Sequence, residues 1–259
     1  NSSMSELTHT TLFPLLAVIA RIAGLAIIAP VFGSPAIPKI VRGAIVVTLG
    51  FSAWTMASIA PIQEASLVGL GVVLVGEFAI GAAIGFFMAL PLVAVQMGGS
   101  MMGQQMSIAL PSMLDPATGG ESDELGRGFM MFALVGFVVV GGIEQTYLAT
   151  VGSFSPLPAA SLASQSIITT LTGLLDVLFE FGFRVALPLV AILMLQTAAL
   201  AMVARSMPQL NIFSVGLPLR ILVGLMVLVA GLGIIGTMMS TFMPDMVGSV
   251  SEWATGVAQ

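Results

Sequence analysis

Apolar residues run along this chain in long blocks, separated by short polar or glycine-rich connections. A block of about 20 apolar residues is typical of a membrane-spanning helix, because it covers the ~30 Å hydrocarbon core of a bilayer. The pattern predicts an all-α integral membrane protein with about six long hydrophobic helices. We expect them at residues 12–32, 40–61, 67–95, 129–151, 167–204 and 215–243.

Several of these blocks contain residues that bend or interrupt a helix. The fifth block is too long for a simple span and carries Asp176, Glu180, Arg184 and Pro188. We therefore expect an amphipathic or broken entry before its main apolar part. Further prolines lie within or at the ends of other blocks, namely Pro14, Pro30, Pro91 and Pro218. The helices should accordingly be partly broken.

The stretch from Phe78 to Leu114 has no charged side chain, and its second half changes from Ala, Ile and Phe to Gly, Gln, Ser and Met. As one helix it would extend ~55 Å, well beyond the bilayer core. We expect the glycine-rich half to lie outside lipid contact, surrounded by protein or water. Residues 96–127 then form a plug-like Met/Gly loop followed by an acidic connection. This element suggests a gate rather than an enzyme.

The composition supports a membrane protein, since 58% of the residues are hydrophobic and 7% are charged. Soluble domains carry about a quarter of charged residues. No soluble domain stands out at either end, so residues 1–259 are predicted to form a single membrane-embedded domain. Residues 1–10 lack the basic start and cleavage site of a secretory signal, and we expect the first apolar block to be retained.

Charge placement predicts an orientation. Lys39, Arg42, Arg127 and Arg205 fall in the first, third and fifth connections, and the second and fourth contain no Lys or Arg. The positive-inside rule then places the odd-numbered connections in the cytoplasm and both termini outside. The seven basic residues are scattered, so nucleic acid is not an expected partner.

The residues needed for common catalytic sites are scarce. His9 is the only histidine, and no cysteine is present to act as a nucleophile or thiolate ligand. Neither a zinc-binding HExxH motif nor a glycine-rich phosphate loop occurs. Asp176 has only Glu180 one turn away, a spacing equally expected of a polar helix face. We expect no enzyme activity, cofactor or metal.

Arg21, Glu77 and Arg184 lie within apolar blocks, where an ion costs ~2.5–3.5 kcal/mol unless it is paired or faces water. Each should point into a protein interface. One interpretation is an ion or proton pathway, and the favoured one is a structural ion pair that locks helices together. The spacing of Glu180 and Arg184 also suits a local pair on one helix face.

Five methionines crowd a short region that also contains Gly98, Gly99 and Gly103; they are Met97, Met101, Met102, Met106 and Met113. Thioethers suit soft Cu(I), so a copper pathway is one interpretation. Filler packing in a helix bundle is another. We favour adaptable apolar packing that closes a passage and can rearrange, because methionine is flexible and the glycines permit backbone movement.

Four groups of residues resemble the FliR family of flagellar type III secretion. The most specific run is Ala204, Arg205, Ser206, Met207, Pro208, Gln209, Leu210, Asn211, Ile212, Phe213, Ser214, Val215, Gly216, Leu217, Pro218, Leu219. Others are Ala20, Arg21, Gly24, Leu25, Ala29, Pro30, Phe32, Gly33, Ile37, Pro38, Val41, Arg42; then Gln105, Met106, Ser112, Met113, Asp115, Pro116, Gly119; and Phe181, Gly182, Arg184, Leu187, Pro188. The family's basic residue after the Pro–Leu pair is often Lys and here is Arg220. A histidine common near the end of the fourth segment is missing around residues 142–145.

The resemblance implies a non-enzymatic inner-membrane subunit at the flagellar basal body. It would assemble with FliP and FliQ into a closed helical export gate, associate with FlhB, and pass unfolded flagellar subunits. In that family the helices pack as tilted hairpins, and the loop after the third segment plugs the pore. The implied plug residues are Met101, Met102, Gln104, Gln105, Met106 and Met113. The implied structural or interface residues are Arg21, Glu77, Arg184, Pro208, Gln209, Asn211 and Phe213.

An alternative from another class is a stand-alone secondary transporter with its site at Arg21 and Glu77 and with broken helices around it. The lack of an inverted repeat in the sequence argues against it. A Cu(I) channel is the third possibility, and it predicts methionine-dependent copper uptake without partner proteins.

Overall fold

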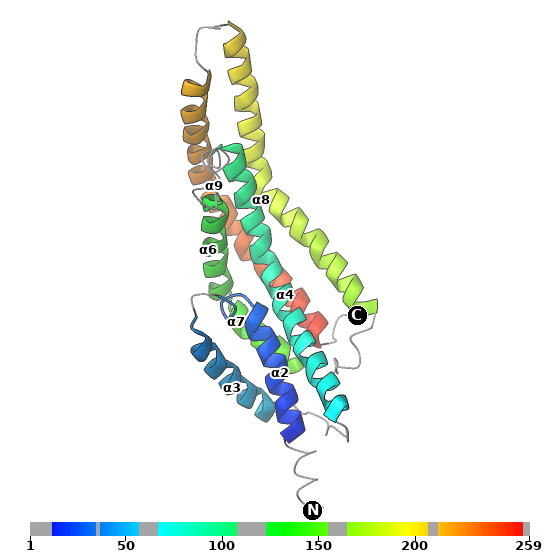
Figure 1. Ribbon diagram of the computed structural model, residues 1–259. Helices are drawn as coiled ribbons and strands as arrows, with labels where there is room; N and C mark the ends of the chain where they lie inside the picture. Colours follow the sequence, from blue (N-terminus) through cyan, green and yellow to red (C-terminus); the bar gives the residue numbers. More distant parts are fainter. Residues whose placement is uncertain are drawn as a thin grey trace, which may run out of the picture. The chain divides into compact units, whose positions relative to one another are not determined.

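The computed structural model describes residues 12–34, 37–56, 67–107, 123–154, 165–206 and 212–255. Within these ranges the regular structure is helical and contains no strand, which confirms the predicted all-α class there. The helices are α2 (Phe13–Ile28), α3 (Lys39–Met56), α4 (Leu67–Gln105), α6 (Glu124–Val139), α7 (Gly142–Gly152), α8 (Gln165–Ser206) and α9 (Ile212–Thr255) (Figure 1).

One helix among the described residues is long and apolar enough to cross a membrane, over residues 68–105. A second span results if α6 and α7 are counted together, and Phe13–Ile28, Val190–Ser206 and Gly216–Ala230 are shorter apolar helices. The apolar blocks therefore do form helices. Six membrane spans and their arrangement as hairpins stay predictions.

The ends of α2 and α6 follow from local chemistry. α2 stops at Ile28, short of the expected residue 32, because Ala29 precedes Pro30 and takes an extended conformation with ψ 142°. A residue before proline is disfavoured in the helical region. α6 stops at Val139 because Gly141 has φ +80°, and α7 begins directly afterwards. The expected fourth helix is thus two helices, a break that only glycine makes at low cost.

One predicted interruption is wrong. The expected glycine-rich loop from residue 96 is helical as far as Gln105, where α4 ends. Gly98 and Gly99 are buried, and a Cβ at Gly99 would lie 2.8 Å from Phe129 Cβ. Close packing against α6 therefore offsets the weak helix propensity of glycine. α8 continues through Pro188, whose missing N–H removes one helical bond without ending the helix. Of the two expected forms of this entry, the broken one is therefore absent, and the amphipathic one stays a prediction.

The described residues form two compact units. The first unit contains α2, α3, α7 and residues 67–90 of α4. Its core has Val18, Ile22 and Ala53 fully buried, with Trp54 and Tyr147 packed against them. Figure 1 shows α2, α3 and α7 lying together. α4 joins α2 where Gly24 and Gly81 leave no room for a side chain: a Cβ at Gly81 would collide with the Arg21 carbonyl.

The second unit contains residues 91–105 of α4, 124–136 of α6, 176–206 of α8 and 212–243 of α9. Its buried apolar side chains include Leu92, Met102, Met106, Phe129 and Leu193. The end of α4 and the start of α6 are tied together here, because Ser100 Oγ donates a 2.6 Å hydrogen bond to Asp123 Oδ2. This unit holds the described part of the expected plug.

Candidate functional site

A buried polar cluster in the first unit is built around Arg21 of α2. Its Nε donates to Glu77 Oε2 of α4 at 2.6 Å, and its Nη1 donates to Ser153 Oγ at 2.7 Å, just after α7. The guanidinium carbon lies 4.1 Å from the ring centroid of Phe154. The Arg21 side chain is fully buried and that of Glu77 is 10% exposed. The cluster therefore joins three elements that are distant in sequence.

Two features place these groups together. Gly24 and Gly81 let the backbones of α2 and α4 approach closely, which brings Arg21 against Glu77. In α7, Thr146, Thr150 and Ser153 each donate a hydroxyl hydrogen bond to a carbonyl three or four residues earlier. Ser153 still has a lone pair to accept from Arg21. Glu77 supplies the charge, and Ser153 and Phe154 complete the enclosure.

The cluster has the features of a structural lock. Arg21 and Glu77 form the ion pair between helices that the sequence favoured, and Arg21 also donates to Ser153. Sequence reasoning missed Ser153 and Phe154, since neither residue type nor spacing distinguishes them. A buried ion pair is costly to break on one side, because the remaining charge loses its compensation.

Arg184 behaves differently from the other two charges. It pairs with Glu180 one turn earlier in α8, as the spacing predicted. The side chains are 51% and 56% exposed in this chain, so the expected place of Arg184 in a protein interface depends on a partner subunit and stays a prediction. An exposed pair of this kind contributes at most about 1 kcal/mol. Arg184 thus belongs to a surface of α8.

The predicted plug residues lie on two sides of the last turns of α4. Met102 and Met106, four positions apart, are both buried. Gln104 is exposed, and Met101 and Gln105 are half-buried. The structure therefore brings two of the methionines into the second unit and leaves the glutamines at its edge. Met113 lies outside the described residues.

The turn that ends α4 contacts α8 and α9. A Cβ at Gly224 of α9 would lie 2.5 Å from Met106 Cγ and 2.8 Å from its Sδ. Arg220, one turn earlier in α9, donates from Nη1 to Ser107 Oγ at 2.9 Å and from Nη2 to Thr197 Oγ1 of α8 at 2.5 Å. Ser107 itself has φ +58°. Arg220 thus connects three helices of the second unit.

The start of α6 is fixed by Asp123. Its Oδ1 accepts a 3.1 Å hydrogen bond from the Gly126 N–H, the geometry of a helix N-cap. Its other oxygen accepts from Ser100 of α4. A Cβ at Gly126 would collide with the Asp123 carboxylate and the Ser100 hydroxyl. The carboxylate therefore caps one helix and holds the next.

The remaining predicted residues belong to residues 204–219, the run that carries the family resemblance. Pro208, Gln209 and Asn211 lie outside the described residues. Phe213 falls in the first turn of α9, which begins at Ile212. In the part of the chain that the structure describes, no group of three His, Cys, Asp or Glu residues could hold a metal ion.

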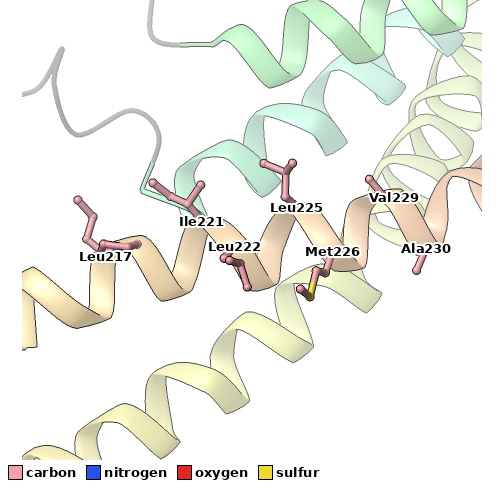
Figure 2. Close-up of a pocket in the computed structure, with 8 residues that line it drawn as sticks. Leu217, Ile221, Leu222, Leu225, Met226, Val229 and Ala230 are labelled. Atoms are coloured by element: carbon pink, nitrogen blue, oxygen red, sulfur yellow. The ribbon is translucent and has the colours of Figure 1, made fainter.

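An apolar groove of about 850 Å³ runs along α9. Its lining residues are Leu217, Pro218, Ile221, Leu222, Leu225, Met226, Val229 and Ala230. Figure 2 shows Ile221 and Leu225 pointing to one side of the helix and Leu222 and Met226 to the other. Leu222 and Met226 are more than half exposed. The helix thus presents a wide apolar surface to its surroundings.

Comparison with known proteins places the chain in a family. Residues 12–246 match the family model of bacterial export proteins, family 1. Flagellar biosynthetic protein FliR of Escherichia coli K12 is 30% identical over 84% of this chain and 82% of its own length. FliR of Aquifex aeolicus is 28% identical over 90% of this chain and 91% of its own. Surface presentation of antigens protein SpaR of Shigella flexneri is 26% identical over 88% of each. The chain therefore belongs to the bacterial export proteins, family 1, the family of FliR in type III secretion.

Proposed function

We propose that this chain is a subunit of the flagellar type III protein export apparatus and forms part of its export gate in the inner membrane. The observation that carries the proposal is the family match over residues 12–246, together with FliR relatives that align along most of both chains. Its partners are FliP, FliQ and FlhB-like subunits, and its substrates are unfolded flagellar proteins. It acts as a wall and plug and catalyses no reaction.

The surface supports a location among lipids and partner subunits. Large apolar side chains are exposed on successive helices, such as Ile40 on α3, Val68 on α4, Val139 on α6 and Leu195 on α8, each more than 70% exposed. Exposed apolar patches mark membrane or protein contacts. We propose one membrane-embedded domain in which both compact units are covered in this way.

The end of α4 supports the plug. Met101, Met102 and Met106 are uncharged, flexible and polarizable, so they can separate around a passing chain and close again without leaving a stranded charge. Gln104 and Gln105 add polar groups at the edge. In this proposal residues 101–106 and Met113 close the passage beside methionines of FliP.

Mass measurement tests the assembly. The tagged chain is expressed with its FliP-like, FliQ-like and FlhB-like partners, extracted in mild detergent, and the intact mass of the complex is measured. We expect a discrete hetero-oligomer. A monodisperse single-protein species that binds a small solute or copper would overturn the export-gate proposal in favour of a transporter or a Cu(I) channel.

Conductance tests the plug. Shortening residues 101–106 in the assembled complex should make the membrane leak ions or small solutes. Gly233→Ala on α9 is the control, because a Cβ there meets nothing within 4 Å. Unchanged conductance in a complex that still assembles would show that residues 101–106 do not plug the passage. The proposed role in the gate wall would be unaffected.

A further inference from the structure

Met106, which directly follows the last residue of α4, packs against Gly224 of α9, where the missing side chain leaves room for the thioether. Met106 is fully buried, and its Cγ, Cε and Sδ all lie within 2.8 Å of the place where a Cβ would stand on Gly224. Any residue other than glycine at position 224 would have to displace the thioether. The methionine and the glycine are therefore matched to each other in shape.

A second contact lies one residue further along. Ser107 has φ +58°, which is uncommon for a residue other than glycine. Such a conformation persists only where its surroundings hold it. Arg220 does so, because it hydrogen-bonds the Ser107 hydroxyl while its other arm holds Thr197 of α8.

Both contacts, Met106 against Gly224 and Arg220 to Ser107, can break and form again. Among the described residues Arg220 has no carboxylate within ion-pair distance, and its described acceptors are two neutral hydroxyls. These bonds are charge-assisted on the guanidinium side, but neither hydroxyl supplies a countercharge of the kind found in an arginine–carboxylate pair. A flexible thioether in a glycine notch can also leave without stranding a polar group. The contacts define a closed position without locking it permanently.

We propose that Arg220, Thr197, Ser107, Met106 and Gly224 form a latch that holds the end of α4 closed against α8 and α9, and that the latch must release for export. Arg220 is the positioning residue and Met106 with Gly224 is the catch. The inference rests on the proposed function only for its second half, because the closed contacts belong to the chain itself.

Thiol labelling tests the latch without any export assay. The chain has no native cysteine, so Met102→Cys, one turn before Met106, supplies one buried thiol and leaves the latch residues in place. Its maleimide labelling rate in the assembled complex is measured with Arg220 intact and with Arg220→Gln. We expect labelling at least five-fold faster in the double variant. Ser107→Ala, which removes one acceptor and leaves Arg220 in place, should raise the rate less. Equal rates in all three would overturn the latch.

A disulfide tests whether release is needed. The Met106 Cγ, whose place the sulfur of a cysteine would take, lies 2.5 Å from where a Cβ would stand on Gly224, so Met106→Cys/Gly224→Cys is suited to a disulfide after a local shift. We expect oxidation to lower export of a flagellar substrate at least ten-fold and reduction to restore it, with both single variants insensitive to redox. Full export through the cross-linked protein would overturn the release step. Export by complexes that lack this chain altogether would instead overturn the proposed function.

Discussion

At the scale of single residues, the Arg21–Glu77 pair allows the cost of leaving a buried charge without compensation to be measured. Glu77→Gln should destabilise the chain by about 3–5 kcal/mol, because Arg21 would stay charged and enclosed without its partner. The measurement is chemical unfolding in detergent. The matched control is Glu180→Gln, which breaks an exposed pair and should cost at most about 1 kcal/mol.

The double variant Arg21→Met/Glu77→Leu sharpens this prediction. Replacing both members of a buried pair by apolar side chains of similar size is often neutral. We expect the double variant to be more stable than Glu77→Gln alone. If it is less stable, the hydrogen bond to Ser153 and the contact with Phe154 outweigh the cost of burying the charges. In a stand-alone transporter, Glu77→Gln would abolish transport without lowering stability.

The charged residues of this cluster could be predicted from the sequence, and its neutral residues could not. Arg21 and Glu77 stand out because ions are rare in apolar blocks. Ser153 and Phe154 carry no such mark, and their role depends on how α7 is placed against α2. Arg184 is exposed in this chain, and its apolar neighbours in sequence do not show which face of α8 a partner subunit would cover.

At the scale of helices, glycine decides where two elements meet. Gly81→Ala on α4 should destabilise the first unit by about 1–3 kcal/mol, because the new methyl group collides with backbone atoms of Arg21, which cannot rotate away. Gly71→Ala on the same helix meets nothing within 4 Å and should stabilise it by about 0.8–1 kcal/mol. Thermal unfolding of the two variants separates these signs, and two equal shifts would contradict the close approach.

The start of α6 offers a second test at this scale. Asp123→Ala removes the N-cap and should cost about 0.5–2 kcal/mol, whereas Asp123→Asn keeps a capping oxygen and should cost less. Hydrogen exchange of the Gly126 amide reports the cap directly. Equal protection in both variants would contradict the role of Asp123 at this turn, because Asp123→Ala removes both the cap and the acceptor for Ser100.

The helix patterns were easier to predict than their ends. Long apolar blocks identified the helical segments because the length of an apolar run can be read directly from the sequence. The end of α4 was placed ten residues early because local propensity counts each glycine as a weak point, whereas burial of Gly98 and Gly99 against a neighbouring helix compensates for it. The break at Gly141 was missed because a positive φ at one glycine has no periodic signal.

At the scale of the whole molecule, many large apolar side chains stay exposed, and we expect lipid or partner subunits to cover them. The exposed apolar residues extend over α3, α4, α6, α8 and α9, and the groove on α9 is lined by apolar residues. The fully buried apolar residues are largely those that hold each compact unit together, such as Val18 and Ile22 in the first and Met106 in the second. Surface that remains apolar in water favours association.

This predicts that stability depends on partners. A ligand or subunit that binds only the folded chain at 100 times its Kd adds about 2.7 kcal/mol to the free energy of unfolding. We expect the chain in the assembled gate to unfold at a clearly higher Tm than the same chain alone in the same detergent. The measurement is fluorescence-detected thermal unfolding of both samples. The matched control adds partner subunits from which FliP is omitted, because a general effect of extra membrane protein would persist there. An identical Tm with and without partners would mean that detergent alone is enough to cover the apolar helices, and the chain would then be stable without partner subunits.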